Sequence, residues 1–317
     1  MKKLLLMLGM LCVGPSLIGL GDTWAKEIGV KELSAQDLRV YPVYDAALVG
    51  KRIIAVGEWG LILTSVDSGQ KWTLQQGPTE ETLTEIRFAD GMTGWAVGHH
   101  GTILKTTDGG VTWTDRTPDV EASDPLLGVY FADKNHGFAV GSFGFLLESQ
   151  DGGTTWQKRD IGQGDMHLKA INGSPDGNIY IAGEQGKVLH SSDRGANWKP
   201  LQTGYKGSFW GVLVTDKAVL LHGMRGTVYL SENRGQSWSR VPSNTTVGLI
   251  AGAVLSPSSI VLAGAEGTVL QSTDGGHSFK AASLADHSPI NTALPLSSSS
   301  ALLLGRSVPN VFNLTTP

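Results

Sequence analysis

Short apolar segments alternate with polar turns along this chain, and the same arrangement returns about every forty residues. Each unit has an apolar segment, a polar turn, and a second apolar segment that ends in glycine and leads into a Gly-x-x-Gly turn. A third segment follows, and a turn of the form Ser/Thr-x-Asp-x-Gly-x-x-Trp leads into a fourth. Short apolar segments bounded by glycine-rich turns predict β-strands rather than helices.

The Asp position of the Ser/Thr-x-Asp-x-Gly-x-x-Trp turn marks the period. Its occupants are separated by 41, 43, 42, 40 and 41 residues, and they are Asp67, Asp108, Asp151, Asp193, Asn233 and Asp274. The glycine that ends the second segment occurs seven times, at positions 57, 98, 141, 183, 223, 264 and 305. This period, with four strands per unit, predicts an all-β, seven-bladed β-propeller with four-stranded blades.

The seventh unit is shorter than the others. After Gly305 it contains only one further segment, Val308–Leu314, and no Asp turn. A ring of sheets has to close in order to cover its last blade. We therefore expect the N-terminal segment, within Gly29–Val40, to close the ring by supplying the missing outer strand of the seventh blade.

The Asp turn, or Asp-box, has a structural explanation. Its Ser/Thr and Asp side chains accept hydrogen bonds from backbone N–H groups, and its glycine permits a positive φ. The Trp that follows, replaced once by Phe279, supplies a large apolar area to the blade. Calcium binding is the alternative, but each turn offers about one carboxylate, and Asn233 occupies one of the six positions. We interpret the six residues as structural.

Composition and the N-terminal sequence limit which compartment and which classes of partner we expect for the chain. The net charge is −4 and the basic residues form no runs, which argues against a nucleic-acid partner. Two N-terminal lysines and an apolar run to Leu20 predict a signal peptide over residues 1–25 and a propeller over residues 26–317, with an uncleaved anchor as the alternative. The single cysteine, Cys12, lies in the signal. We expect export to an oxidising compartment, either a periplasm or one like the thylakoid lumen.

Sialidases also contain Asp-boxes, so a sialidase-like glycoside hydrolase or a glycan-binding protein is the alternative function. Such an enzyme needs an arginine cluster, a tyrosine nucleophile and an acidic partner, whereas Arg194 and Arg234 lie in Asp turns. His99 and His100 are adjacent, so their side chains point apart in an extended segment and form a poor metal pair. We expect no catalytic residues, no cofactor and no metal site.

The two positions inside each Gly-x-x-Gly turn vary while the frame repeats. Strand alternation places these turns on the face opposite the Asp turns, together with the loops between blades. Variable residues in a constant frame are typical of a recognition surface, although unselected turn residues would vary in the same way. We predict a protein interface that includes Glu58, Trp59, His99, His100, Ser142, Phe143, Glu184, Gln185, Met224, Arg225, Glu266 and Arg306.

The repeat G-x-x-G-x-[IVL]-[LY]-x-[ST]-x-D-x-G-x-x-W, within about Val43 to Phe312, resembles that of the photosystem II stability/assembly factor family. The resemblance implies a non-catalytic exported propeller that binds a membrane-protein complex or assembly intermediate. We expect a monomer, peripheral at a membrane surface, with an envelope transport system as the alternative to a photosystem.

The resemblance also implies an arginine-rich patch on one face as the binding site. Here only Arg225 and Arg306 occupy the Gly-x-x-Gly turns, and acidic residues stand at Glu58, Glu184 and Glu266. This departure favours a different membrane partner.

Overall fold

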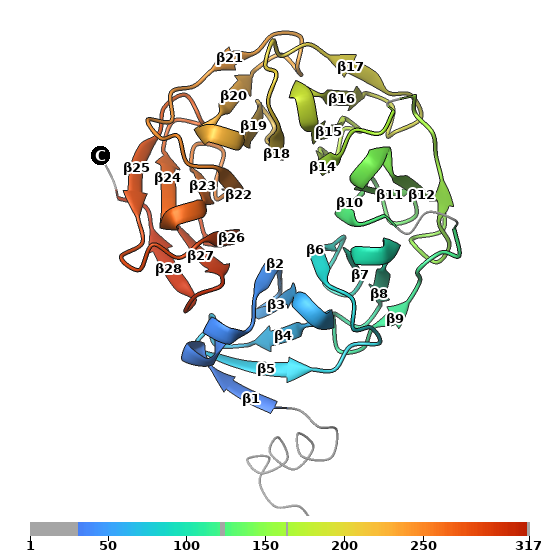
Figure 1. Cartoon of the computed structure of the whole chain (residues 1–317), viewed down its shortest axis with the longest axis vertical. Coiled ribbons are helices and arrows are strands. Elements are labelled where there is room, and N and C mark those ends of the chain that lie inside the picture. Colours follow the sequence, from blue (N-terminus) through green and yellow to red (C-terminus); the bar gives the residue numbers. More distant parts are fainter. Residues whose placement is uncertain (1–30, 121–123, 163, 316–317) are drawn as a thin grey trace, which may run out of the picture.

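The computed structural model describes residues 31–120, 124–162 and 164–315. Seven antiparallel sheets stand around a central axis, as Figure 1 shows, and the predicted seven-bladed, all-β propeller is confirmed. The predicted signal peptide, residues 1–25, lies outside the described residues. No helix in the described part of the chain is long and apolar enough to cross a membrane.

Each blade is a meander whose strands run in order from the axis to the rim. The innermost strands are β2 (Val43–Val49), β6 (Leu83–Phe88), β10 (Leu126–Phe131), β14 (Leu168–Gly173), β18 (Phe209–Val214), β22 (Leu249–Val254) and β26 (Ile290–Ser297). The second strands are β3 (Arg52–Gly57), β7 (Gly94–Gly98), β11 (Gly137–Gly141), β15 (Ile179–Gly183), β19 (Val219–Gly223), β23 (Ile260–Gly264) and β27 (Ser300–Gly305).

The third strands are β4 (Ile62–Ser65), β8 (Ile103–Thr106), β12 (Leu146–Ser149), β16 (Val188–Ser191), β20 (Val228–Ser231), β24 (Thr268–Ser272) and β28 (Asn310–Asn313). Six blades add an outer strand: β5 (Lys71–Gln75), β9 (Thr114–Asp115), β13 (Gln157–Lys158), β17 (Lys199–Leu201), β21 (Ser239–Arg240) and β25 (Lys280–Ser283). Short 3-10 turns join the second and third strands of blades 1 to 6: η2 (Glu58–Gly60), η3 (His99–Gly101), η4 (Ser142–Gly144), η5 (Glu184–Gly186), η6 (Met224–Gly226) and η7 (Ala265–Gly267).

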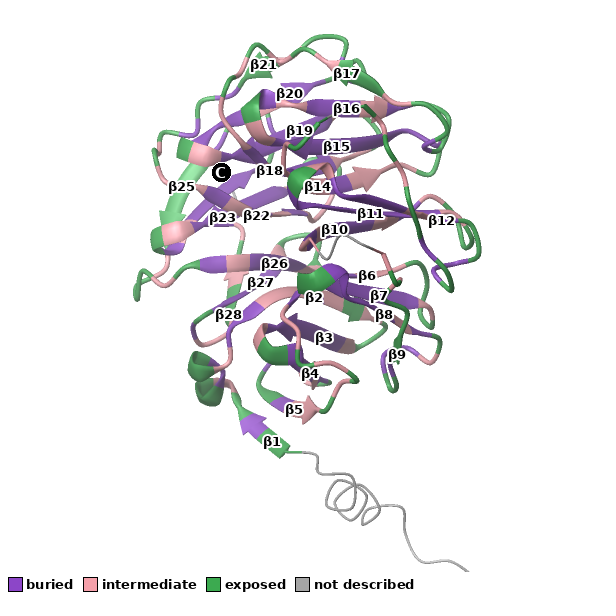
Figure 2. Ribbon diagram, turned by 45° about the vertical axis from the view of Figure 1, so that its right-hand side comes forward, coloured by how far each residue is buried: buried purple, intermediate pink, exposed green. Residues whose placement is uncertain are grey.

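The core lies between neighbouring blades. Every residue of β7, β11, β15, β19 and β23 is buried, and Figure 2 shows these strands in purple between their neighbours. A strand covered on both faces needs apolar residues throughout, which explains continuous runs such as Ile179–Gly183. Each blade is therefore stabilised by the next one around the ring.

The N-terminal segment lies at the ring closure, but not in the way the sequence suggested. Strand β1 (Lys31–Ser34) pairs with β5 as a fifth strand of blade 1, with Lys31 opposite Leu74, and blade 7 has three strands among the described residues. The prediction that this segment supplies the outer strand of blade 7 is therefore wrong. β5 is the longest outer strand and offers four residue pairs to β1, which keeps the segment within its own blade.

Closure instead depends on side chains. The 3-10 helix η1 (Ala35–Val40) places Leu38, which is 1% exposed, in a cluster with Leu302 and Leu304 of blade 7. Asp45 of blade 1 accepts a hydrogen bond from Thr292 Oγ1 of blade 7 (2.8 Å) and another from the Ile86 amide of blade 2 (3.0 Å). Blades 7, 1 and 2 are thus linked through one carboxylate.

The Asp turns share one hydrogen-bond pattern, which the turn at Asp151 illustrates. Asp151 Oδ1 accepts bonds from the Thr155 amide (2.9 Å) and from Ser149 Oγ (2.9 Å), and these bonds lower the pKa of Asp151 to about 2. At Asn233 the amide group keeps this role, because Oδ1 accepts from the Ser237 amide (2.9 Å) while Nδ2 donates to Ser237 Oγ (2.8 Å). An amide therefore performs the same bonding, as a structural turn requires.

Leu38→Ala should lower the free energy of unfolding by about 2–4 kcal/mol, because it removes a buried side chain from the seam between blades 7 and 1. Val40→Ala is the matched control in the same helix, since Val40 is 71% exposed, and it should change stability by less than about 0.5 kcal/mol. Urea denaturation followed by circular dichroism measures both variants. Equal stability of the two variants would contradict this account of closure.

Candidate functional site

The Gly-x-x-Gly turns are held in place by the loops that lead into the innermost strands. A Cβ on Gly57, Gly98 or Gly141 would overlap the carbonyl oxygen of the residue just before the innermost strand of the same blade. The next residue donates its amide to that same oxygen, as in His99 N to Thr82 O (2.8 Å) and Ser142 N to Pro125 O (2.9 Å). The first glycine of the frame is therefore required by a close backbone approach.

The second free position of each turn is held in the left-handed region. Its φ lies between 52° and 56° in all six turns, and its occupants are Trp59, His100, Phe143, Gln185, Arg225 and Glu266. A residue other than glycine in this region costs on the order of 1 kcal/mol. Non-glycine residues of three Asp turns, Ser68, Arg194 and Arg234, share this conformation, so the strain belongs to both kinds of turn, and only the Gly-x-x-Gly turns hold a non-glycine residue there in all six blades.

This backbone conformation exposes the side chains at the second position. All six are exposed, and the two aromatic members, Trp59 and Phe143, are 75% and 57% exposed. The first positions are less accessible: Glu58, Glu184 and Met224 are half-buried, Ser142 is buried, and His99 is exposed. Arg306, in the first position of blade 7, is exposed. The predicted interface residues thus separate into an outward set and a supporting set.

One contact of the supporting set joins blades 1 and 7, where the ring closes. Glu58 Oε1 accepts hydrogen bonds from Arg306 Nη2 (3.0 Å) and from Tyr44 OH (2.9 Å). Burial, followed by the bond to Glu58, raises the pKa of Tyr44, so its hydroxyl stays protonated as the donor. Glu58 and Arg306 are therefore partly occupied with each other and are less available to a partner than their sequence positions suggest.

Two outward residues also have neighbours in the loops between blades. His100 Nδ1 lies 2.7 Å from Glu81 Oε2, and the rings of Phe143 and His167 are 4.7 Å apart. The loops therefore lie on the same face as the turns. We call this face the turn face and define it by the second-position residues of η2–η7. Figure 1 shows these turns as short coils arranged around the axis.

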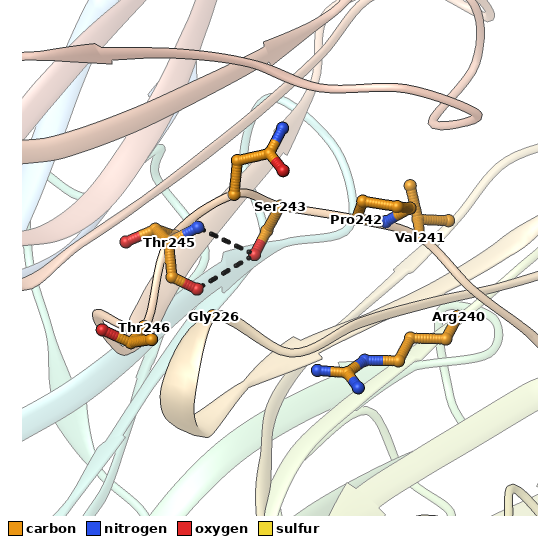
Figure 3. A pocket seen from close by; sticks show the side chains of 8 residues that line it. Gly226, Arg240, Val241, Pro242, Ser243, Thr245 and Thr246 are labelled. Atoms are coloured by element: carbon orange, nitrogen blue, oxygen red, sulfur yellow. Dashed lines mark hydrogen bonds between the residues drawn. The ribbon is translucent and has the colours of Figure 1, made fainter.

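Two hollows adjoin the turn face. One of about 640 Å³ lies beside Trp59 and is lined by Tyr41, Leu74 and Pro78, with Glu58 and Glu80 contributing acidic groups. The other, of about 720 Å³, lies beside η6 and is lined by Gly226 and residues 240–246 (Figure 3). Its one ionisable lining residue is Arg240, so it lacks the paired acid and base that general acid–base catalysis uses.

The axial channel contains charged groups that the sequence did not single out. It measures about 860 Å³ and is lined by the innermost strands. Arg87 Nη2 donates a hydrogen bond to Glu85 Oε1 (2.8 Å). The nearby charge of Asp45 acts to raise the pKa of both groups. Burial raises the pKa of Glu85 to about 7, while the neighbouring Arg87 opposes that shift.

Asp45 and His222 link neighbouring blades, whereas Glu85 is paired within its own strand. Both oxygens of Asp45 accept bonds from other blades, and Glu85 pairs with Arg87 two residues along β6. His222, fully buried in the channel wall, donates Nδ1–H to the Leu249 carbonyl (3.0 Å), and burial lowers its pKa to about 4. Within the described ranges no group of three or more His, Cys, Asp or Glu residues could hold a metal ion.

Glu85 should make stability depend on pH. Folded Glu85 keeps its proton up to about pH 7, whereas an unfolded glutamate loses it near pH 4.5, so its contribution is greatest below pH 4.5 and declines as pH rises to 7. Between about pH 5 and about pH 8, the free energy of unfolding of the native protein should fall by about 1–3 kcal/mol more than that of Glu85→Gln. Effects of His222 are common to both proteins and cancel. Parallel pH dependences in urea denaturation would contradict the assignment.

Comparison with solved structures places the fold among known propellers. A structure described as YCF48 bound to D1 peptide shares 19% identity at a TM-score of 0.71, covering 90% of this chain and 95% of that one. YCF48 from Cyanidioschyzon merolae shares 16% identity at a TM-score of 0.69, covering 90% of this chain and 98% of that one. The structure of the RRP9 WD40 repeats shares 13% identity at a TM-score of 0.72, covering 90% of this chain and 97% of that one. At these identities the likeness concerns the fold alone.

Sequence comparison defines the family. No curated protein matches the chain. The family described as photosynthesis system II assembly factor YCF48 matches residues 64–126 and 117–255, which together span more than half of the chain. The chain therefore belongs to the YCF48 family of photosynthesis system II assembly factors.

Proposed function

We propose that this chain is a non-catalytic accessory factor that binds a segment of a membrane protein, or of an assembly intermediate, through the turn face. The observation that carries the proposal is the repeated left-handed position, which presents Trp59 and Phe143 to solvent at a cost in backbone strain. Exposed aromatic side chains in a rigid frame suit a protein partner, because they bury large apolar areas with little loss of side-chain entropy.

Family membership supports the same function. One protein of similar fold, YCF48, is described as bound to D1 peptide, so a propeller of this kind can bind a peptide. The turn residues carry both signs of charge: Arg225 and Glu266 belong to the outward set, and in the supporting set Arg306 is paired with Glu58. Such a face favours a partner segment held by aromatic contacts over one held by a cluster of arginines.

The proposed location follows from the N-terminus and from cysteine usage. Residues 1–25 have the pattern of a signal peptide, and the remainder of the sequence contains no cysteine. We therefore place the protein in a periplasm or a thylakoid-lumen-like compartment, as a monomer peripheral to the membrane that contains its partner.

The Trp59→Ala/Phe143→Ala double variant should lose binding to the membrane partner. When the chain is immobilised and exposed to detergent-solubilised membranes of the source organism, the protein retained by the native chain should fall at least about tenfold. Both side chains are exposed, so the thermal midpoint should remain near that of the native chain.

The matched control is Val66→Ala/Val111→Ala. These residues are 76% and 54% exposed and lie in Asp turns on the opposite face. The control should retain the partner as the native chain does. Loss of the partner in the control, or its retention by the Trp59/Phe143 variant, would count against the turn face.

A further inference from the structure

The third strand of blade 7 differs from its counterparts. β8, β12 and β16 are mostly buried, and each pairs along its outer edge with a further strand of its blade. β28 is mostly exposed, and Val311 is 47% exposed. Within residues 31–315, apart from the gaps given above, no strand pairs with the outer edge of β28. Since β1 is paired with β5, the N-terminal strand does not cover this edge.

The hydrogen-bond register shows which backbone groups point outward. Leu314 N donates to Ser299 O (2.9 Å), and Phe312 lies opposite Ala301, so the backbone groups of residues 312 and 314 face β27. Those of Val311 and Asn313 therefore face away from the sheet. In the described part of the chain neither residue makes a backbone hydrogen bond on that side.

The open edge has defined ends. At one end Pro309 has no N–H to donate. At the other the Thr315 amide is already bound by Gln271 Oε1 of blade 6 (3.1 Å). Two residues, Val311 and Asn313, are left to pair with an incoming strand, so the edge accepts a short extended segment rather than a long one.

We propose that the outer edge of β28 binds an extended segment of a partner protein as the fourth strand of blade 7. β28 contains no ionisable residue, which matches an uncharged segment. Val311 shares a face with Leu302, toward blade 1, while Phe312 shares the other face with Ala301, toward blade 6. The segment should therefore carry uncharged, largely β-branched side chains, as strand addition to a sheet edge requires.

A partner segment fits this edge better than a second copy of the chain. Two pairing residues bury far less than the roughly 1,200–2,000 Å² of a stable interface, so edge-to-edge dimers would be weak. The other free edge, that of β1, carries Lys31 and Glu32, charges of the kind that prevent strand addition. The inference rests on the proposed function, because the segment at β28 belongs to the same partner protein that binds the turn face and continues beyond that face.

Val311→Pro tests the proposal with a defined probe. The variant removes an outward N–H while keeping the bonds between β27 and β28, so blade 7 should stay folded. The probe is the blocked peptide Thr-Val-Ser-Val-Thr, titrated into the isotope-labelled full chain and followed by NMR. It should shift the amides of Val311 and Asn313 in the native chain, and Val311→Pro should weaken binding about tenfold.

The control variant, Val311→Thr, keeps the backbone donor and should bind the peptide within about threefold of the native chain. A peptide with glutamate in place of both valines should not bind. Trp59→Ala/Phe143→Ala should bind the first peptide normally. If the peptide fails to bind while membrane retention still depends on Trp59 and Phe143, the edge proposal fails and the proposed function stands.

Three results would overturn the proposal. The peptide could bind Val311→Pro as well as it binds the native chain. The amides of Val311 and Asn313 could exchange slowly with solvent in the free chain, which would show that the chain covers its own edge. Light scattering could reveal a dimer that Val311→Pro abolishes, which would make a second copy the occupant.

Discussion

A propeller blade cannot bury its own two faces, and this constraint governs the rest of the structure. The second strands are almost entirely apolar, as β11 and β15 illustrate, because each is packed on both sides by a neighbouring blade. The stability of any one blade therefore depends on completion of the ring. The least repetitive part of the molecule, the contact between blades 7 and 1, performs that closure through Leu38, Asp45 and the pair formed by Glu58 and Arg306.

The same constraint determines where variation is tolerated. Residues within the strands contact the next blade, whereas the second position inside each Gly-x-x-Gly turn is exposed to solvent. The first glycine holds the turn against the loop that leads into the innermost strand, and the following bond makes the turn rigid. A rigid frame can hold residues such as Trp59 and Phe143 in a strained conformation and present them in an ordered ring.

The sequence predicted what repeats and missed what occurs once. The period indicated seven blades, and the Asp positions indicated the turns, because each repeated residue satisfies a local hydrogen-bond or packing requirement. The pairing of β1 with β5 was not predictable, since backbone groups at the edges of β5 and β28 are chemically alike. The raised pKa of Glu85 arises from burial beside Asp45 of another blade, a proximity that follows only from the closed ring. The separation of outward from supporting residues depends on the left-handed second position, which the sequence pattern does not specify.

Site-specific photocrosslinking tests most directly whether the turn face is where the partner binds. A benzophenone amino acid in place of Phe143, on the turn face, is compared with the same group in place of Val111, which is similarly exposed on the opposite face. In intact membranes of the source organism, we predict that irradiation joins a membrane protein to the chain from position 143 and not from position 111. Crosslinking of that protein from position 111 alone would contradict a partner site on the turn face.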